Sequence, residues 1–384
     1  MNDESYLSAV CRGSVPGGVV SAAALENAAH TALDPKVFAY IAGGAGDGST
    51  LRSNLREFER WEFVPPILTA LAPGNTSTTL FGDTLELPLL IAPIGVLGTV
   101  VSQGELALAS AARSSMVKMC MSNSASRSIE EVATELHPQR GWFQIYWPQD
   151  TELGESFLRR AQHAGFDAIV VTVDNRVQPY RPLAIDHSYS PFMAGEGLGV
   201  YLSDPVFNDR LGRDRDSLDA AVELWRQIYP MTNLDWAALK RIRELTPLPL
   251  VVKGVMTAED AERAVDAGAD GIVVSNHGGR QCERVAPALR QLPSVVSRVG
   301  EKVPVVFDSG IRSGADVLIA LALGASAVFI GRPVVWALAV GGAAHAHHYL
   351  MCLKAEMRLS MANLGVTRVD QLSGIVRRTA SSSD

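Results

Sequence analysis

A regular alternation of short apolar segments and helical patterns, beginning at residue 87, most constrains the fold of this 384-residue chain. Eight segments have the length and apolar content of buried strands, and helical patterns separate nearly all of them. The expected strands are residues 87–93, 117–122, 142–147, 168–174, 250–254, 271–275, 303–308 and 327–331. This alternation is typical of parallel βαβ units, and eight strands are enough to close a (β/α)8 TIM barrel. A doubly wound open sheet uses the same units, but the strand count favours the barrel.

Recurring turn sequences support this interpretation. Residues 164–171, 267–274 and 323–330 resemble one another weakly, and in each a glycine is placed to end a helix before a strand begins. Capping boxes are predicted at Ser128-x-x-Glu131, Thr257-x-x-Asp260 and Ser313-x-x-Asp316. The barrel is therefore expected to occupy residues 85–374.

Three regions depart from the alternation. Residues 1–84 predict an N-terminal helical cap segment, with helices over 22–40 and 50–61 and a hairpin over 78–87, closing the barrel bottom or one side of its mouth. Residues 175–235 follow the fourth strand and are rich in proline and charge, which predicts a lid insertion over the mouth. Residues 375–384 are expected to form a disordered tail.

Composition excludes several classes of protein. A net charge of −7 without a long basic run argues against a nucleic-acid partner. Cys11, Cys120, Cys282 and Cys352 are widely spread and indicate neither a disulfide framework nor a metal site. The acidic N-terminus lacks the apolar core of a signal peptide, and glycine, arginine and proline interrupt the apolar residues 317–340. We expect a soluble cytoplasmic protein.

Reactive side chains cluster at the expected strand ends, where barrel active sites are built. The sixth strand runs into Ser275-Asn-His-Gly-Gly-Arg-Gln281, whose imidazole and guanidinium suit acid–base chemistry and carboxylate binding. Asp174, at the end of the fourth strand, is a suitable partner for His277, and Arg181 follows it. An ordinary βα turn with a capping histidine and a surface arginine is the alternative for this motif alone.

Two further strand ends indicate an anion site. Lys253 ends the fifth strand and places an ammonium group at the mouth. The glycine-containing turns 307–312 and 330–333 follow the last two strands, which is the usual place for a phosphate in such barrels. Phosphate-binding barrels without a redox cofactor share this feature, so it predicts an anchor and no particular reaction.

The motif at residues 275–281 closely resembles that of the FMN-dependent 2-hydroxyacid oxidases and dehydrogenases. Residues 38–47, 93–95, 144–146, 307–312 and 331–333 are similar to segments of the same family. The resemblance implies FMN as cofactor and a catalytic group made of His277, Asp174, Arg280, Arg181, Tyr40 and Tyr146. It implies cofactor contacts from Pro93, Ile94, Gly95, Ser122, Gln144, Thr172, Lys253, Ser275, Asp308, Ser309, Gly310, Arg312, Gly331 and Arg332.

Within the family the likeness is strongest to the lactate 2-monooxygenase branch. It implies oxidation of a small, lactate-like L-2-hydroxy acid with oxygen, coupled to decarboxylation, in a homotetramer or homo-octamer. One alternative is a related oxidase or dehydrogenase that acts on a larger substrate and releases the keto acid. A remote alternative is a non-catalytic phosphate- or flavin-binding barrel. Residues 175–180 and Ser124, where relatives often carry Trp or Leu, depart from the pattern and bear on the substrate.

Overall fold

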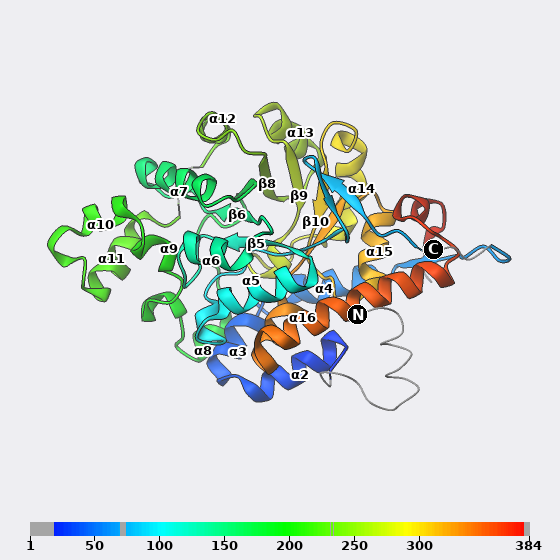
Figure 1. The fold of residues 1–384 in the computed structure, drawn as a ribbon, viewed down its shortest axis with the longest axis horizontal. Helices are drawn as coiled ribbons and strands as arrows, with labels where there is room; N and C mark the ends of the chain where they lie inside the picture. Colours follow the sequence, from blue (N-terminus) through cyan, green and yellow to red (C-terminus); the bar gives the residue numbers. More distant parts are fainter. Residues whose placement is uncertain (1–18, 70–73, 231, 233, 380–384) are drawn as a thin grey trace.

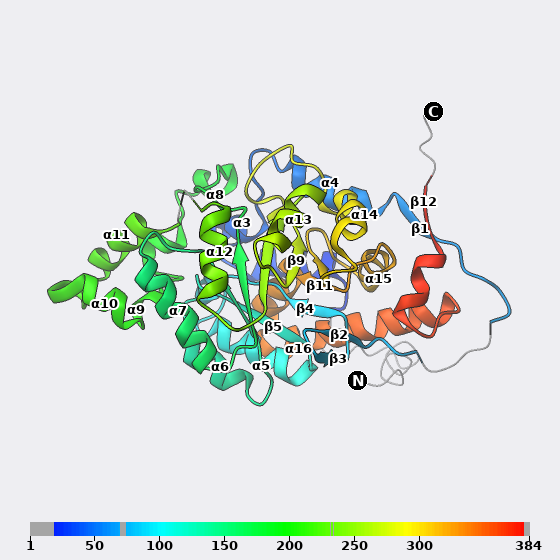
Figure 2. The same ribbon diagram turned by 90° about the horizontal axis from the view of Figure 1, so that it is seen from above.

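The computed structural model describes residues 19–69, 74–230, 232 and 234–379, which are organised around a closed barrel of parallel strands (Figures 1 and 2). The strands are β4 (Leu89–Ile91), β5 (Lys118–Ser122), β6 (Trp142–Ile145), β7 (Ala168–Thr172), β8 (Leu250–Val255), β9 (Gly271–Val274), β10 (Val305–Phe307) and β11 (Ala327–Ile330). They pair in sequence order, and β11 closes the barrel on β4. The predicted (β/α)8 barrel is confirmed, and the open sheet is excluded.

Helices surround the barrel, and all but the last return the chain to the bottom of the next strand. They are α5 (Gly104–Ser115), α6 (Ile129–Leu136), α7 (Thr151–His163), α12 (Trp236–Glu244), α13 (Ala258–Asp266), α14 (Ala288–Val299), α15 (Gly314–Ala322) and α16 (Arg332–Asn363). Ser128 and Ser313 form the predicted capping boxes, and Thr257 accepts a hydrogen bond from the Asp260 amide. The predicted helix-ending glycines 165, 268 and 324 all have positive φ, as a left-handed cap requires.

The hairpin of the N-terminal segment closes the bottom of the barrel. Its strands β2 (Thr78–Leu80) and β3 (Asp83–Leu85) pair as expected. At its tip, Phe81 packs against Trp142 inside the barrel, with ring centroids 5.6 Å apart. Lys118, buried at the start of β5, contacts Asp83 of the hairpin and Asp167, so an ion-pair network fixes the hairpin to the barrel.

The N-terminal helices lie at the other end, beside the mouth. The expected helix over residues 22–40 is two helices, α2 (Ala22–Ala32) and α3 (Pro35–Ala42), because Asp34 caps a new helix in which Pro35 is the first residue. The second expected helix is α4 (Ser49–Phe58), which ends before Trp61. The loop after α3 binds the barrel, since the Ala45 amide donates to the Gly279 carbonyl. The N-terminal segment thus closes the barrel bottom with its hairpin and covers one side of the mouth with its helices, the two positions that the sequence left as alternatives.

The insertion after β7 is largely helical. Its elements are α8 (Pro182–Asp186), η2 (Pro191–Ala194), α9 (Gly199–Leu202), α10 (Pro205–Leu211), η3 (Gly212–Asp214) and α11 (Leu218–Ile228). In both views α10 and α11 extend beyond α7, away from the barrel (Figures 1 and 2). The fully buried Asp204 caps α10 and accepts from Ser156 Oγ (2.8 Å) and Arg160 Nη1 (3.0 Å) of α7. This outer part is therefore anchored to the barrel wall.

The C-terminal segment corrects one expectation. After η5 (Val369–Gly374), strand β12 (Val376–Arg378) pairs antiparallel with β1 (Trp61–Phe63). The expected disordered tail is therefore wrong for residues 376–378, and residues 380–384 lie outside the described part of the chain. The apolar stretch 317–340 divides among α15, β11 and α16. Within the described ranges, the search for a helix able to span a membrane found none.

Candidate active site

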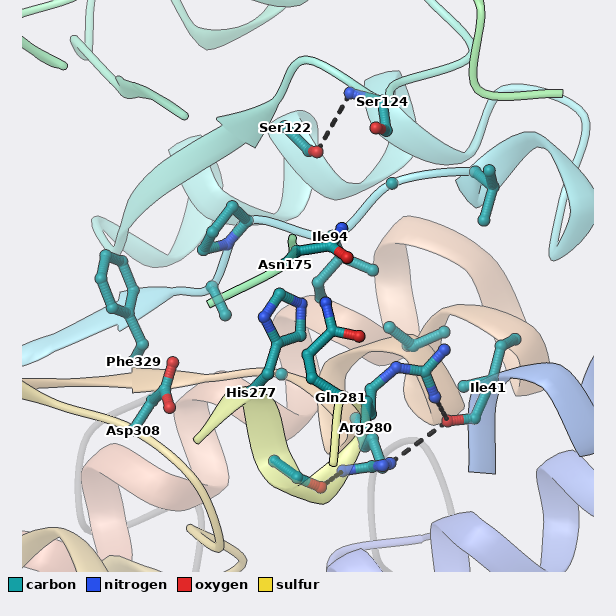
Figure 3. A pocket seen from close by; sticks show the side chains of 18 of the residues that line it. Ile41, Ile94, Ser122, Ser124, Asn175, His277, Arg280, Gln281, Asp308 and Phe329 are labelled. Carbon is teal, nitrogen blue, oxygen red and sulfur yellow. Dashed lines mark hydrogen bonds between the residues drawn. The ribbon is translucent and has the colours of Figure 1, made fainter. Parts of the chain in front are cut away.

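One cavity opens at the carboxyl ends of the barrel strands, with about 1240 Å³ of empty space including the part open to solvent (Figure 3). Most of the predicted site residues line it: Tyr40, Pro93, Ile94, Gly95, Ser122, Tyr146, Arg181, Lys253, His277, Arg280, Asp308, Ser309, Gly310, Arg312, Gly331 and Arg332. The remaining predicted residues, Gln144, Thr172, Asp174 and Ser275, are not in its lining. Three of these contact residues that line it: Gln144 bonds to Ser122, Asp174 to His277, and Ser275 to Lys253.

His277 and Asp174 form a hydrogen-bonded pair. His277 begins the short helix η4 (His277–Gly279) with φ of 59°, a conformation that is uncommon for residues other than glycine. Its Nδ1 lies 2.9 Å from Asp174 Oδ1, and its Nε2 lies 3.4 Å from the Tyr146 hydroxyl, at hydrogen-bond distance. Burial lowers the pKa of His277 below its ordinary value, and the Asp174 carboxylate offsets part of that effect. The pair therefore presents a neutral, oriented imidazole nitrogen to the cavity.

A glycine at the end of β8 allows this pairing. A side-chain Cβ at Gly254 would lie 2.6 Å from the Cβ of Asp174, and Gly254 has φ of +108°. Although burial raises the pKa of Asp174, its interaction with His277 and the positive charge of Lys253 hold that pKa below its ordinary value. The carboxylate thus stays ionised behind the imidazole.

Two arginines flank the ring of Tyr40, which α3 places at the mouth. The Arg181 and Arg280 guanidinium carbons lie 5.5 and 5.3 Å from the ring centroid. Arg181 Nε donates to the Arg280 carbonyl (3.1 Å), which ties the two arginines together. Burial and the charge of Arg181 lower the pKa of Arg280. Two cations held close together in this way are arranged to receive a carboxylate.

A second cationic region lies around the ends of β10 and β11. Burial and the charges of Arg280 and Arg312 lower the pKa of Arg332 far below its ordinary value. Arg332 donates to the carbonyls of Ile41 (3.2 Å), Gly43 (3.2 Å) and Gly278 (3.0 Å). A phosphate group would relieve this repulsion.

The ends of β6 and β7 carry polar atoms that have no hydrogen-bond partner among the described residues. These buried atoms are Gln144 Nε2 on β6 and Thr172 Oγ1 on β7. Lys253 Nζ lies 3.2 Å from Asp308 Oδ2, and although burial lowers its pKa, the carboxylates of Asp308 and Asp174 raise it above the ordinary value. These residues fit a ligand whose planar polar group lies beside the Lys253 cation and whose phosphate lies at one end. FMN has this chemistry.

A parallel barrel whose mouth holds a His–Asp pair, two neighbouring arginines and a separate cationic region fits an oxidoreductase that uses a phosphorylated redox cofactor. Residues 29–378 match the model of the FMN-dependent dehydrogenase family, and the chain belongs to that family. FMN is its cofactor, and it is an FMN-dependent 2-hydroxyacid oxidoreductase. The prediction of family and cofactor is confirmed.

Relatives with different substrates match the chain similarly well. It is 38% identical to an FMN-dependent alpha-hydroxy acid dehydrogenase of Penicillium citrinum, over 90% of this chain and 87% of that protein. It is also 38% identical to L-lactate oxidase of Lysinibacillus sphaericus, over 91% of this chain and 90% of the relative. A crystal structure of mandelate oxidase superposes with a TM-score of 0.84 at 35% identity, covering 94% of this chain and all of the other.

The insertion contributes cavity residues that the sequence did not predict. Phe192 and Tyr229 line the cavity, and Phe192 stacks on Trp225 of α11 with centroids 4.6 Å apart. Tyr229 packs edge-on against Tyr146 (5.4 Å) and accepts a hydrogen bond from Asn175 Nδ2 (2.8 Å). The spacing of Trp225 and Tyr229, one helical turn apart, was a signal for a shared packing surface.

Asn276, which stands in the predicted catalytic motif, has a structural contact. Its side-chain amide and that of Asn54 in α4 donate to each other, both at 2.8 Å. Its Nδ2 also donates to the Ala286 carbonyl (3.0 Å). Asn276 therefore fixes the loop that carries His277 to the N-terminal segment.

Arg332→Ala is expected to weaken FMN binding by about 10- to 100-fold, because a hydrogen bond to a charged group is worth about 1.5–3 kcal/mol. Free flavin after gel filtration measures the loss, and reduction of the fraction still loaded should change little. Arg298→Ala, which removes an exposed arginine paired with Glu262, is the matched control. Equal FMN retention by both variants would place Arg332 outside the phosphate site.

Proposed function

We propose that this protein oxidises an L-2-hydroxy acid with molecular oxygen as the electron acceptor. The observation that carries the proposal is the His277 imidazole, which is bound to Asp174 through Nδ1 and faces the Tyr146 hydroxyl with Nε2. In the same cavity, the Arg181–Arg280 pair is placed to receive the substrate carboxylate. A base beside a carboxylate clamp suits proton removal from a carbon that carries a hydroxyl group or from that hydroxyl.

Each side chain then has a defined role. Arg181 and Arg280 bind the carboxylate, and Tyr40 and Tyr146 orient the hydroxyl group of the reacting carbon. His277 Nε2 accepts a proton, and Asp174 stabilises the imidazolium that results. FMN, when bound, supplies the two-electron step and passes the electrons to oxygen.

The proposed cofactor contacts divide by chemistry. Pro93, Ile94, Gly95, Ser122, Gln144, Thr172 and Lys253 would hold the ring system, with Lys253 providing positive charge. Ser275 and Ser309 would support the residues around the cofactor. Ser275 accepts a hydrogen bond from Lys253, and Ser309 accepts one from the Gly278 amide. Asp308, Gly310, Arg312, Gly331 and Arg332 would hold the ribityl phosphate.

We further propose that the keto acid stays in the site and is decarboxylated there, with lactate as the reference substrate. Lactate and oxygen would give acetate, carbon dioxide and water, because hydrogen peroxide formed beside bound pyruvate reacts with it. This needs a cavity that stays closed through the oxygen step. The anchored insertion, whose Phe192 and Tyr229 form part of the cavity wall, supports such retention.

A second candidate is an oxidase that releases keto acid and hydrogen peroxide from a larger substrate. The small side chain of Ser124 favours it, because it leaves room in the cavity wall. The similarity to mandelate oxidase also supports a larger substrate.

The two candidates differ in products. Lactate and mandelate should be supplied separately with oxygen, and peroxide, keto acid, shortened acid and carbon dioxide should be measured together. We expect the shortened acid and carbon dioxide in equal amounts, with little peroxide. Stoichiometric peroxide and keto acid without carbon dioxide would contradict coupled decarboxylation and leave the second candidate.

We also propose a cytoplasmic homo-oligomer, either a tetramer or an octamer. The support is the family resemblance, and light scattering of the purified protein measures the state directly. A monomer at micromolar concentration would contradict it.

A further inference from the structure

Ser124 is a buried polar residue in the cavity wall whose hydroxyl group has no hydrogen-bond partner in the described part of the chain. It follows the end of β5, lines the cavity and is 4% exposed (Figure 3). Its Oγ makes no hydrogen bond to any described residue, although Ser122, two positions earlier, bonds to Gln144. Leaving a buried hydroxyl unpaired costs about 1–3 kcal/mol, so such a group in a cavity indicates a ligand atom.

The wall around Ser124 is otherwise apolar and closely packed. The Ser124 carbonyl accepts from the Val96 amide (2.9 Å), and Val96 has φ of 56°, a strained value for a β-branched residue. A Cβ at Gly95 would lie 2.7 Å from that carbonyl, and one at Gly197 would lie 2.8 Å from both it and Phe192 Cε1. Backbone and apolar groups thus crowd the sides of Ser124.

This part of the wall is formed by the segment after β4 and by the insertion. Val96 belongs to the segment that leads into η1 (Leu97–Thr99), and Phe192 and Gly197 belong to the insertion. The proposed phosphate contacts come instead from the ends of β10 and β11. A substrate held by its carboxylate at Arg280 would direct its side chain along one of these walls.

We infer that Ser124 Oγ hydrogen-bonds to a polar group on the substrate's side chain, so that Ser124 determines specificity. The substrate class is a 2-hydroxy acid whose side chain is mainly apolar but carries a hydroxyl or carbonyl group. The inference rests on the proposed oxidation of a 2-hydroxy acid, and it favours the larger substrate, because the methyl group of lactate would leave Ser124 unpaired.

The test compares pairs of acids that differ by one hydroxyl group. 3-Phenyllactate and its 3- and 4-hydroxyphenyl derivatives, with the corresponding mandelates, place that group at several distances from the reacting carbon. The holoenzyme should show about 10-fold higher kcat/KM for at least one hydroxylated member. Ser124→Ala should abolish this preference by slowing only the hydroxylated acid, since its Oγ bonds to nothing else. Ser102→Ala, at an exposed serine, is the matched control.

Binding of the corresponding keto acids to each holoenzyme, measured by calorimetry, gives a readout independent of turnover. The hydroxylated keto acid should bind about 10-fold more tightly to the wild type and lose that advantage in Ser124→Ala. The inference would be overturned if the ratio of the affinities for the hydroxylated and unhydroxylated keto acids were the same in both proteins, or if the wild type bound both acids equally. Loss of FMN from Ser124→Ala would also overturn it. If the wild type oxidises none of the acids, the proposed function fails. The ratio of keto-acid affinities measured by calorimetry still decides the role of Ser124.

Discussion

His277→Ala is expected to keep its FMN and to slow flavin reduction by the substrate by about 10²–10⁴-fold, the usual effect of removing a general base. The imidazole faces Tyr146 and Asp174 and makes no contact with the cationic region at Arg332, so cofactor loading should not change. Anaerobic stopped-flow absorbance measures reduction, and the visible spectrum gives the FMN content. His187→Ala, at an exposed histidine of the insertion, is the control. Reduction at nearly the wild-type rate would refute the assignment of His277.

The same residue sets the pH dependence. Only the neutral imidazole accepts a proton, so reduction should be fastest above the pKa of His277 and be lost as pH falls through it. Burial lowers this pKa and Asp174 raises it, with the net shift downward, so the acidic limb should lie below the ordinary range for histidine. Asp174→Asn removes the raising contribution, and it should therefore move the limb to still lower pH while slowing reduction. An unmoved limb would mean that another group controls the profile.

Arg280→Lys should reduce kcat/KM by about 10²-fold even though the charge is kept, because misplacement of a bound substrate by about 1 Å has effects of this size. Lysine lacks the planar fork that binds both carboxylate oxygens. Arg280 also donates to the carbonyls of Ile41 (Figure 3) and Gly43, both at 2.9 Å, which fixes the end of α3 beside Tyr40. One ammonium group cannot replace these contacts and also bind the carboxylate.

Two measurements test this prediction. The rate of flavin reduction against substrate concentration separates affinity from chemistry, and both should be impaired. Arg298→Lys, at an exposed arginine, should behave as the wild type. An unchanged response of Arg280→Lys to the substrate would place its side chain outside the carboxylate site.

The barrel was predictable because its strands are buried on both faces and read as short apolar runs. The placement of the candidate site followed from the same pattern, since the carboxyl ends of the strands meet at one mouth. Asp174 and His277, 103 positions apart, come within hydrogen-bond distance for this reason. The cationic region at this mouth was predictable from the arginines after β10 and β11.

Other features depend on long-range packing that no local pattern records. β12 pairs with β1 across more than 300 residues, and its sequence, Val376-Arg-Arg378, has little apolar character. The aromatic wall of Phe192 and Tyr229 forms only when the insertion folds against the mouth. The break between α2 and α3 was marked by Asp34-Pro35, a capping signal that the apolar pattern of the flanking residues obscured.

The most direct test of the assignment of oxidation to this site is anaerobic mixing of the wild-type holoenzyme with a panel of 2-hydroxy acids. The purified protein should be yellow, and at least one acid should bleach it while the matching 2-methoxy acid, which lacks the hydroxyl proton, should not. A yellow protein that no 2-hydroxy acid bleaches would contradict the assignment, and so would equal bleaching by the methoxy acid.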